Sequence, residues 1–287
     1  MSNGDPRRAE PWRPELVLCN VAVAGVPFIE HVAAARAAGF DAISLLGRAH
    51  RRATQRDGLS EHDMITILDD YGIVLTDVEA VGDWLGPAPA DQPKFLDHVY
   101  PAKTYLDIAA ALGARTVVAV HFGAPAPIDL AVTRFIDLCD AAAGCDLDIA
   151  LEFPSFATIS DVSAAWDIVR LADRPNGGLL IDTWHHRRSL VGDDALRAID
   201  GTKVFSVQLS DGPSDPVGPA LSDVTHRSMP GAGAFGVADL VRLLDGLGTR
   251  APIGIEVFDQ ALLERSAQRA AQELGDALRE VLSEALL

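Results

Sequence analysis

The chain has 287 residues, of which 48% are hydrophobic and 23% are charged, and its formal net charge at pH 7 is −17. This composition is typical of a globular protein and excludes a largely disordered chain. The acidic balance argues against a general DNA- or RNA-binding protein, because such proteins present a basic face to the phosphate backbone.

The sequence also argues against secretion and membrane insertion. The start, "MSNGDPRRAEPWRPE", lacks the apolar core of a secretory signal, and the chain has no apolar run of about 18 residues. The three cysteines, Cys19, Cys139 and Cys145, are odd in number and have no paired metal-ligand spacing. We therefore expect a cytoplasmic protein without a disulfide framework.

Short apolar runs alternate with longer segments of helical pattern along the whole chain. Eight strands are predicted, at 15–23, 41–46, 73–80, 115–123, 147–153, 177–185, 203–211 and 252–260. Helices are predicted at 27–39, 60–72, 94–113, 127–145, 161–173, 193–199, 236–248 and 262–286. Ser60 with Asp63 three residues later is the pattern of a helix-starting capping box, and Gly72 is typical of a helix end.

This alternation predicts an α/β protein with a parallel sheet, and eight units predict closure into a single (β/α)8 TIM barrel. An open, doubly wound sheet is the alternative, but the glycine-rich motif of dinucleotide-binding folds is missing after the first strand. We expect an N-terminal tail at 1–14, one barrel over 15–287 and a long polar loop at 210–236.

Polar residues stand at the ends of the last four predicted strands. They are Glu152, Asp182, Gln208 and Glu256. In a closed barrel these side chains converge on one mouth, where like charges need neutralisation. A divalent cation supplies it, and oxygen ligands suit Mg²⁺ or Mn²⁺.

Each of these residues also has a structural interpretation. Asp182 fits the N-cap of a following helix, and the amide of Gln208 fits a hydrogen bond to backbone. His121, at the end of the fourth strand, is either a core histidine or a substrate contact. Glu152 and Glu256 are harder to explain structurally, because each lies between apolar residues where an unpaired carboxylate is costly.

The segments "ALEF", "IDTWHH", "VQLSD", "RSMPGAGAF" and "IGIEVF" resemble, in order, motifs of the xylose isomerase-like TIM-barrel superfamily, the sugar phosphate isomerases and epimerases. The resemblance implies that the four strand-end residues hold a divalent metal. It also implies that Glu152 and Glu256 act as an acid/base pair. His185 and Arg227 would bind substrate oxygens, and His121 is included as a further substrate contact.

Gln208 stands where many relatives have histidine, and in this it resembles the hydroxypyruvate isomerase and 3-dehydroshikimate dehydratase branches. The resulting all-oxygen ligand set favours Mn²⁺ or Mg²⁺, with Co²⁺ and Zn²⁺ as alternatives. The endonuclease IV branch shares the barrel but needs additional histidines and carboxylates for three zinc ions. Gln208 and the acidic net charge of the chain therefore argue against the endonuclease IV branch.

Three functions follow as hypotheses. The leading one is a metal-dependent isomerase or epimerase that acts on a small polyhydroxy carbonyl substrate through an enediolate. The second is a metal-dependent lyase of the 3-dehydroshikimate dehydratase or keto-glycoside type, and the third is a non-catalytic barrel subunit. Neither a nucleic acid nor a membrane is expected as a partner. Apolar positions of the last helix, including Leu274 and Leu278, either close the barrel or join a second copy in a homodimer.

Overall fold

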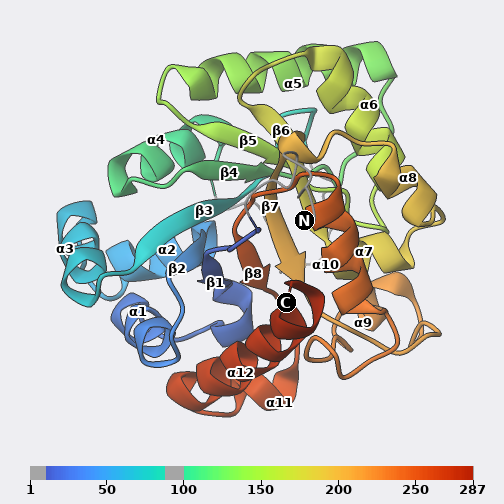
Figure 1. The fold of residues 1–287 in the computed structure, drawn as a ribbon. Helices are drawn as coiled ribbons and strands as arrows, with labels where there is room; N and C mark the ends of the chain where they lie inside the picture. The colour runs from blue at the N-terminus through green and yellow to red at the C-terminus, as the bar shows by residue number, and fades with distance from the viewer. Residues whose placement is uncertain (1–10, 88–99, 287) are drawn as a thin grey trace, which may run out of the picture.

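The computed structural model describes residues 11–87 and 100–286 and shows a closed barrel of eight parallel strands surrounded by helices (Figure 1). The strands follow chain order, and β1 pairs with β8 to close the ring. The strands are β1 Leu16–Leu18, β2 Ala42–Leu46, β3 Val74–Val81, β4 Thr116–Ala119, β5 Asp148–Leu151, β6 Gly177–Asp182, β7 Val204–Leu209 and β8 Ile253–Ile255. The predicted single (β/α)8 TIM barrel is confirmed.

The helices between the strands agree with the predicted segments at most positions. They are α1 Phe28–Ala37, α2 Gly47–Gln55, α3 Glu61–Tyr71, α4 Ala102–Leu112, α5 Ile128–Ala143, α6 Val162–Ala172, α7 Thr183–Arg188, α8 Asp193–Arg197, α9 Ala220–Asp223, α10 Val237–Gly246, α11 Gln260–Leu263 and α12 Ala267–Leu286. The capping box of α3 forms as predicted, with Ser60 and Asp63 satisfying each other's backbone amides, and Gly72 ends the helix in the left-handed region at φ 59°. The part of the predicted helix 94–113 that precedes Tyr100 lies outside the described residues.

Several predicted strands were too long, and helix α2 was not predicted. The sixth strand ends at Asp182 rather than at 185, because the side chain of Asp182 caps α7. The first strand is short because Asn20–Val23 turn into a 3-10 helix. Helix α2 has no strong apolar pattern in the sequence, since the only residues it buries are Gly47, His50 and Ala53.

Trp12 shows that packing begins within the predicted tail. Residues 1–10 of that tail lie outside the described residues, but Trp12 is buried and its indole nitrogen donates to the carbonyl of Ala251 at 3.0 Å. This contact covers the end of the barrel from which β8 starts.

Helix α12 completes the outer ring by packing between α1 and α10 (Figure 1). Its residues Leu274, Leu278 and Val281 are buried against the rest of the chain. These positions therefore serve closure of the barrel. Among the described residues, no helix combines the length and apolar character needed to cross a bilayer.

We predict that Leu278→Ala lowers the free energy of unfolding by about 3 kcal/mol, because it leaves a cavity beneath α12. The control is Glu280→Ala, at an exposed position of the same helix. Chemical denaturation of both variants measures the difference. Equal stability of the two would contradict a core role for α12.

Candidate metal and substrate site

The barrel's carboxyl end holds a pocket of about 780 Å³, including its open mouth. Residues from all eight strand ends and from the loops and helices after them line it: Val21, Leu46, Gly47, Arg48, Glu79, Ala80, Tyr105, Val120, Phe122, Glu152, Pro154, Phe156, His185, Val224, Arg227, Glu256 and Phe258. Parallel strands deliver their carboxyl ends to one face, which is why residues more than 170 positions apart meet here.

Asp182 lies at the centre of this site and is fully buried. One oxygen, Oδ1, accepts hydrogen bonds from the backbone amides of Trp184 at 2.6 Å and His185 at 3.3 Å. The other oxygen, Oδ2, accepts from Arg227 at 2.7 Å. Burial opposes ionisation of Asp182, but the charge of Arg227, the neighbouring imidazole of His185 and the hydrogen bonds outweigh it, so the pKa is lowered. Asp182 is thus both the helix cap and a member of the site.

Glu152 and Glu256 directly follow β5 and β8, and their backbone amides continue the sheet by donating to Ala119 at 2.9 Å and Leu209 at 3.0 Å. Glu256 is buried and Glu152 is partly buried, and both lie among other acids. Burial, followed by repulsion from Asp182 and Glu79, raises the pKa of Glu152 to about 8. Burial also raises the pKa of Glu256 well above its usual value, although Arg227 opposes the change.

His185 is neutral, because burial is the main cause that lowers its pKa to about 4. Both ring nitrogens face hydrogen-bond donors: the backbone amide of Ser155 lies 3.3 Å from Nδ1, and Nη2 of Arg227 lies 3.4 Å from Nε2. Nε2 also lies 3.6 Å from Oε1 of Glu152 and 3.9 Å from Oδ2 of Asp182. His185 therefore presents Nε2 to the carboxylates and to Arg227.

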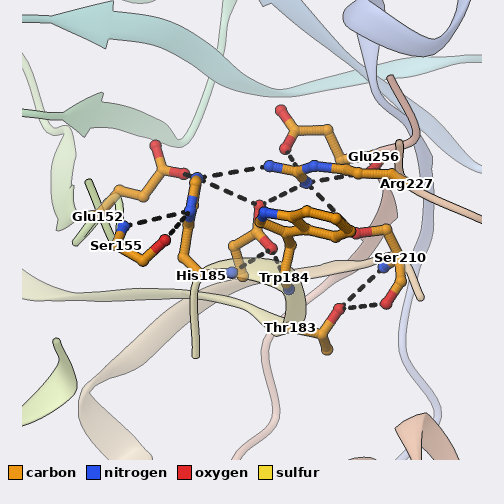
Figure 2. Close-up of polar contacts among 9 residues, drawn as sticks. Glu152, Ser155, Thr183, Trp184, His185, Ser210, Arg227 and Glu256 are labelled. Carbon is orange, nitrogen blue, oxygen red and sulfur yellow. Dashed lines mark hydrogen bonds and ion pairs between the residues drawn. The ribbon is translucent and has the colours of Figure 1, made fainter. Parts of the chain in front are cut away.

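Arg227 links the two sides of the site. Its Nη1 contacts Asp182 Oδ2 at 2.7 Å and Glu256 Oε2 at 2.8 Å, and its Nη2 lies 3.4 Å from His185. Figure 2 shows its guanidinium between the side chains of Glu256 and His185. The structure therefore places Arg227, predicted to bind a substrate oxygen, as a partner of the acidic residues at the pocket wall.

Two other arginines, Arg187 and Arg188, make contacts that hold the loop carrying Arg227, and its side chain therefore reaches the site. Arg188 donates to the buried carboxylate of Asp223 at 2.7 Å and stacks on the ring of Trp184 at 4.6 Å. Arg187 donates to the carbonyl of Phe235 at 2.8 Å. The basic residues that follow Asp182 thus anchor the loop 210–236 over the barrel.

Gln208 is the register partner of Asp182 on the adjacent strand. It is buried, and within the described part of the chain its Oε1 has no hydrogen-bond partner. A buried amide oxygen without a donor is costly, and this oxygen is chemically suited to ligate a cation.

His121 lies away from the pocket, whose walls include the neighbouring residues Val120 and Phe122. Its Nε2 is 3.0 Å from the carbonyl of Ala124, and its ring packs edge-on against Trp84. These contacts match the structural interpretation of His121.

Two pocket residues, Glu79 and Arg48, are absent from the sequence-based prediction. Glu79 is buried near the end of β3, and Arg48 lies in α2 directly after β2. The strand-end rule applied to the later strands also finds Glu79. Arg48 is hidden in a basic run, "GRAHRRATQ", that resembles surface charge.

The residues of the site fit a divalent cation. Glu152, Asp182 and His185 offer ligand atoms within 4.8 Å of one another. The acids Glu79, Glu152, Asp182 and Glu256 face two guanidinium groups, Arg48 and Arg227. If all are ionised, two negative charges remain, which one divalent cation would neutralise.

The model of the xylose isomerase-like TIM barrel family matches residues 32–281. The chain belongs to this family. The resemblance that the sequence motifs indicated is therefore confirmed.

Curated relatives of this xylose isomerase-like barrel are named as enzymes. The 3-dehydroshikimate dehydratase of Pseudomonas aeruginosa is 28% identical over 261 residues, 88% of this chain and 39% of that protein. The chain thus spans about two-fifths of the length of that relative. The inosose isomerase of Bacillus subtilis is 27% identical over 189 residues, 63% of this chain and 67% of that protein.

Among solved structures, the IolI protein with a bound zinc atom superposes with a TM-score of 0.83 at 20% identity, covering 94% of this chain and 99% of that one. At this identity the likeness shows the fold. Together with the named relatives, family membership supports an enzyme of the sugar isomerase, epimerase or dehydratase type.

The raised pKa of Glu152 makes stability depend on pH. Between its usual pKa of 4.5 and the folded value of about 8, this group is ionised in the unfolded chain and protonated in the folded, metal-free protein. Its contribution to stability is therefore present below the lower value and is lost as the pH rises through the upper one. In metal-free protein, Glu152→Gln should raise the melting temperature by about 5 °C at about pH 8.5, and the gain should vanish toward about pH 5.

The control for this measurement is Glu264→Gln, at an exposed position. Thermal melts in the presence of a chelator compare both variants with the unmodified protein across the pH range. A gain that is independent of pH would contradict the proposed protonation of Glu152.

Proposed function

We propose that this chain is a divalent-metal-dependent enzyme that moves a proton at the carbon beside a carbonyl of a small polyhydroxy substrate. The leading reaction is isomerisation or epimerisation. The observation that carries the proposal is the convergence of Glu152, Asp182 and His185 within 4.8 Å, next to the unsatisfied amide oxygen of Gln208.

The proposed metal ligands are Glu152, Asp182, Gln208 and Glu256, with Mn²⁺ or Mg²⁺ as the favoured ions because all four donors are oxygens. When bound, such an ion would polarise a substrate carbonyl and stabilise the enediolate. His185 belongs to the same cluster, and its neutral imidazole is suited to hold a substrate oxygen.

Glu152 and Glu256 are the proposed acid/base pair. A chain of contacts from Glu152 through His185 and Arg227 to Glu256 places the two carboxyl groups at opposite ends of the group (Figure 2). Their raised pKa values suit groups that take up and release protons near neutral pH. Return of the proton to the neighbouring carbon gives isomerisation, and return to the opposite face of the same carbon gives epimerisation.

A dehydratase is the second candidate. The same proton removal followed by loss of a β-hydroxyl group eliminates water. This reading is supported by the dehydratase relative, which matches 88% of the chain against 63% for the inosose isomerase. Both relatives are named for ring ketones with several hydroxyl groups, and the stacked rings of Phe122 and Phe156, 5.9 Å apart, offer a flat apolar wall for a ring.

We predict that metal-free protein binds about one Mn²⁺ per chain and that Glu152→Ala combined with Asp182→Ala abolishes this binding, because two ligands are removed. Mass spectrometry of metal content after dialysis measures it, with the Glu264→Gln variant as control. Equal metal content in all three proteins would contradict the site and favour a non-catalytic barrel.

We predict that Glu256→Gln retains the fold and lowers the exchange of a substrate carbon-bound proton with solvent deuterium by at least about 100-fold. NMR with inosose and with 3-dehydroshikimate as substrates measures this exchange. Ultraviolet absorbance of an aromatic product from 3-dehydroshikimate separates dehydration from isomerisation. Undiminished exchange in the variant would exclude Glu256 as an obligatory acid or base.

A further inference from the structure

A single nitrogen of Arg227 joins two of the proposed metal ligands. Its Nη1 lies 2.7 Å from Oδ2 of Asp182 and 2.8 Å from Oε2 of Glu256. The other oxygen of Asp182, Oδ1, already accepts hydrogen bonds from the backbone amides of Trp184 and His185. Oδ2 is therefore the oxygen with which Asp182 would bind a metal ion, and it is the oxygen that Arg227 contacts.

The guanidinium of Arg227 is held in this place from several sides. Arg227 is 4% exposed, and its guanidinium carbon lies 4.8 Å from the ring centre of Phe258 and 5.6 Å from that of Trp184. Nη1 also lies 3.2 Å from the backbone carbonyl oxygen of Glu256 and 3.3 Å from Oγ of Ser210. The positive charge of Arg227 is thus fixed beside the carboxylates (Figure 2).

This geometry puts a monovalent cation next to the place of a divalent one. An ion bound to Oδ2 of Asp182 at about 2.2 Å would lie within about 5 Å of Nη1, because Nη1 is itself 2.7 Å from Oδ2. A unit charge at such a distance changes the proton affinity of a carboxylate by about 10- to 1000-fold. The affinity for a divalent ion changes in the same direction, since the same positive charge repels it.

We propose that Arg227 determines the affinity of the metal site: its fixed charge competes with the ion for Asp182 and Glu256, so that the ion is bound reversibly. This inference rests on the proposed metal-dependent function. Loss of the charge should tighten metal binding, because two backbone amides still orient Asp182. If Arg227 only positioned the ligands, its loss would instead weaken binding.

Titration calorimetry of Mn²⁺ into metal-free protein tests the proposal at about pH 8, where protons compete less for the carboxylates. Arg227→Met should bind Mn²⁺ at least about 10-fold more tightly than the unmodified protein. Arg227→Lys retains the charge and should bind with nearly unchanged affinity. Arg170→Met, which removes an exposed positive charge from α6, is the control and should also leave the affinity unchanged.

Arg227→Gln removes the charge but keeps a hydrogen-bond donor, and it carries the test if Arg227→Met does not fold. Unchanged or weaker Mn²⁺ binding in the neutral variants would overturn the proposal, as would an equal gain in Arg227→Lys. Absence of Mn²⁺ binding from the unmodified protein and from all its variants would instead overturn the proposed function.

Discussion

The cost of burying several carboxyl groups at one end of the barrel governs the rest of this structure. Asp182 is fully buried, and Glu152 and Glu256 stand close to it at the ends of other strands. Carboxylate groups that are buried close together either take up protons or bind a cation. Arg227 supplies one internal cation, and the raised pKa values of Glu152 and Glu256 show that it does not neutralise the whole group. The remaining demand for positive charge is the physical argument for a divalent metal.

The surrounding fold is arranged to keep Arg227 in place. It comes from a long loop rather than a strand, and loops hold position only when their contacts do so. The ion pair between Arg188 and Asp223 and the stacking of Arg188 on Trp184 provide those contacts. Residues that resemble surface charge in the sequence thus support the site indirectly.

The barrel and the strand-end residues could be predicted because their signals are local. Alternating apolar runs and helical segments predict the eight units, and the position of Asp182 at the end of a run predicts its place at the mouth. The extent of the sixth strand could not be predicted, since Asp182 ends that strand by capping the following helix. Glu79 was detectable by the same strand-end rule, whereas the burial of Arg48 in the pocket depends on where helix α2 packs.

The sequence by itself determined the fold class, the family and three of the four acidic residues at one end of the barrel, Glu152, Asp182 and Glu256. Tertiary structure alone decided how these residues pair. The contact between Arg227 and Asp182 joins positions 45 residues apart, and that between Arg227 and Glu256 joins positions 29 residues apart. The physical reason is that periodicity is set by neighbouring residues, whereas hydrogen bonds and ion pairs across the barrel exist only once it has closed.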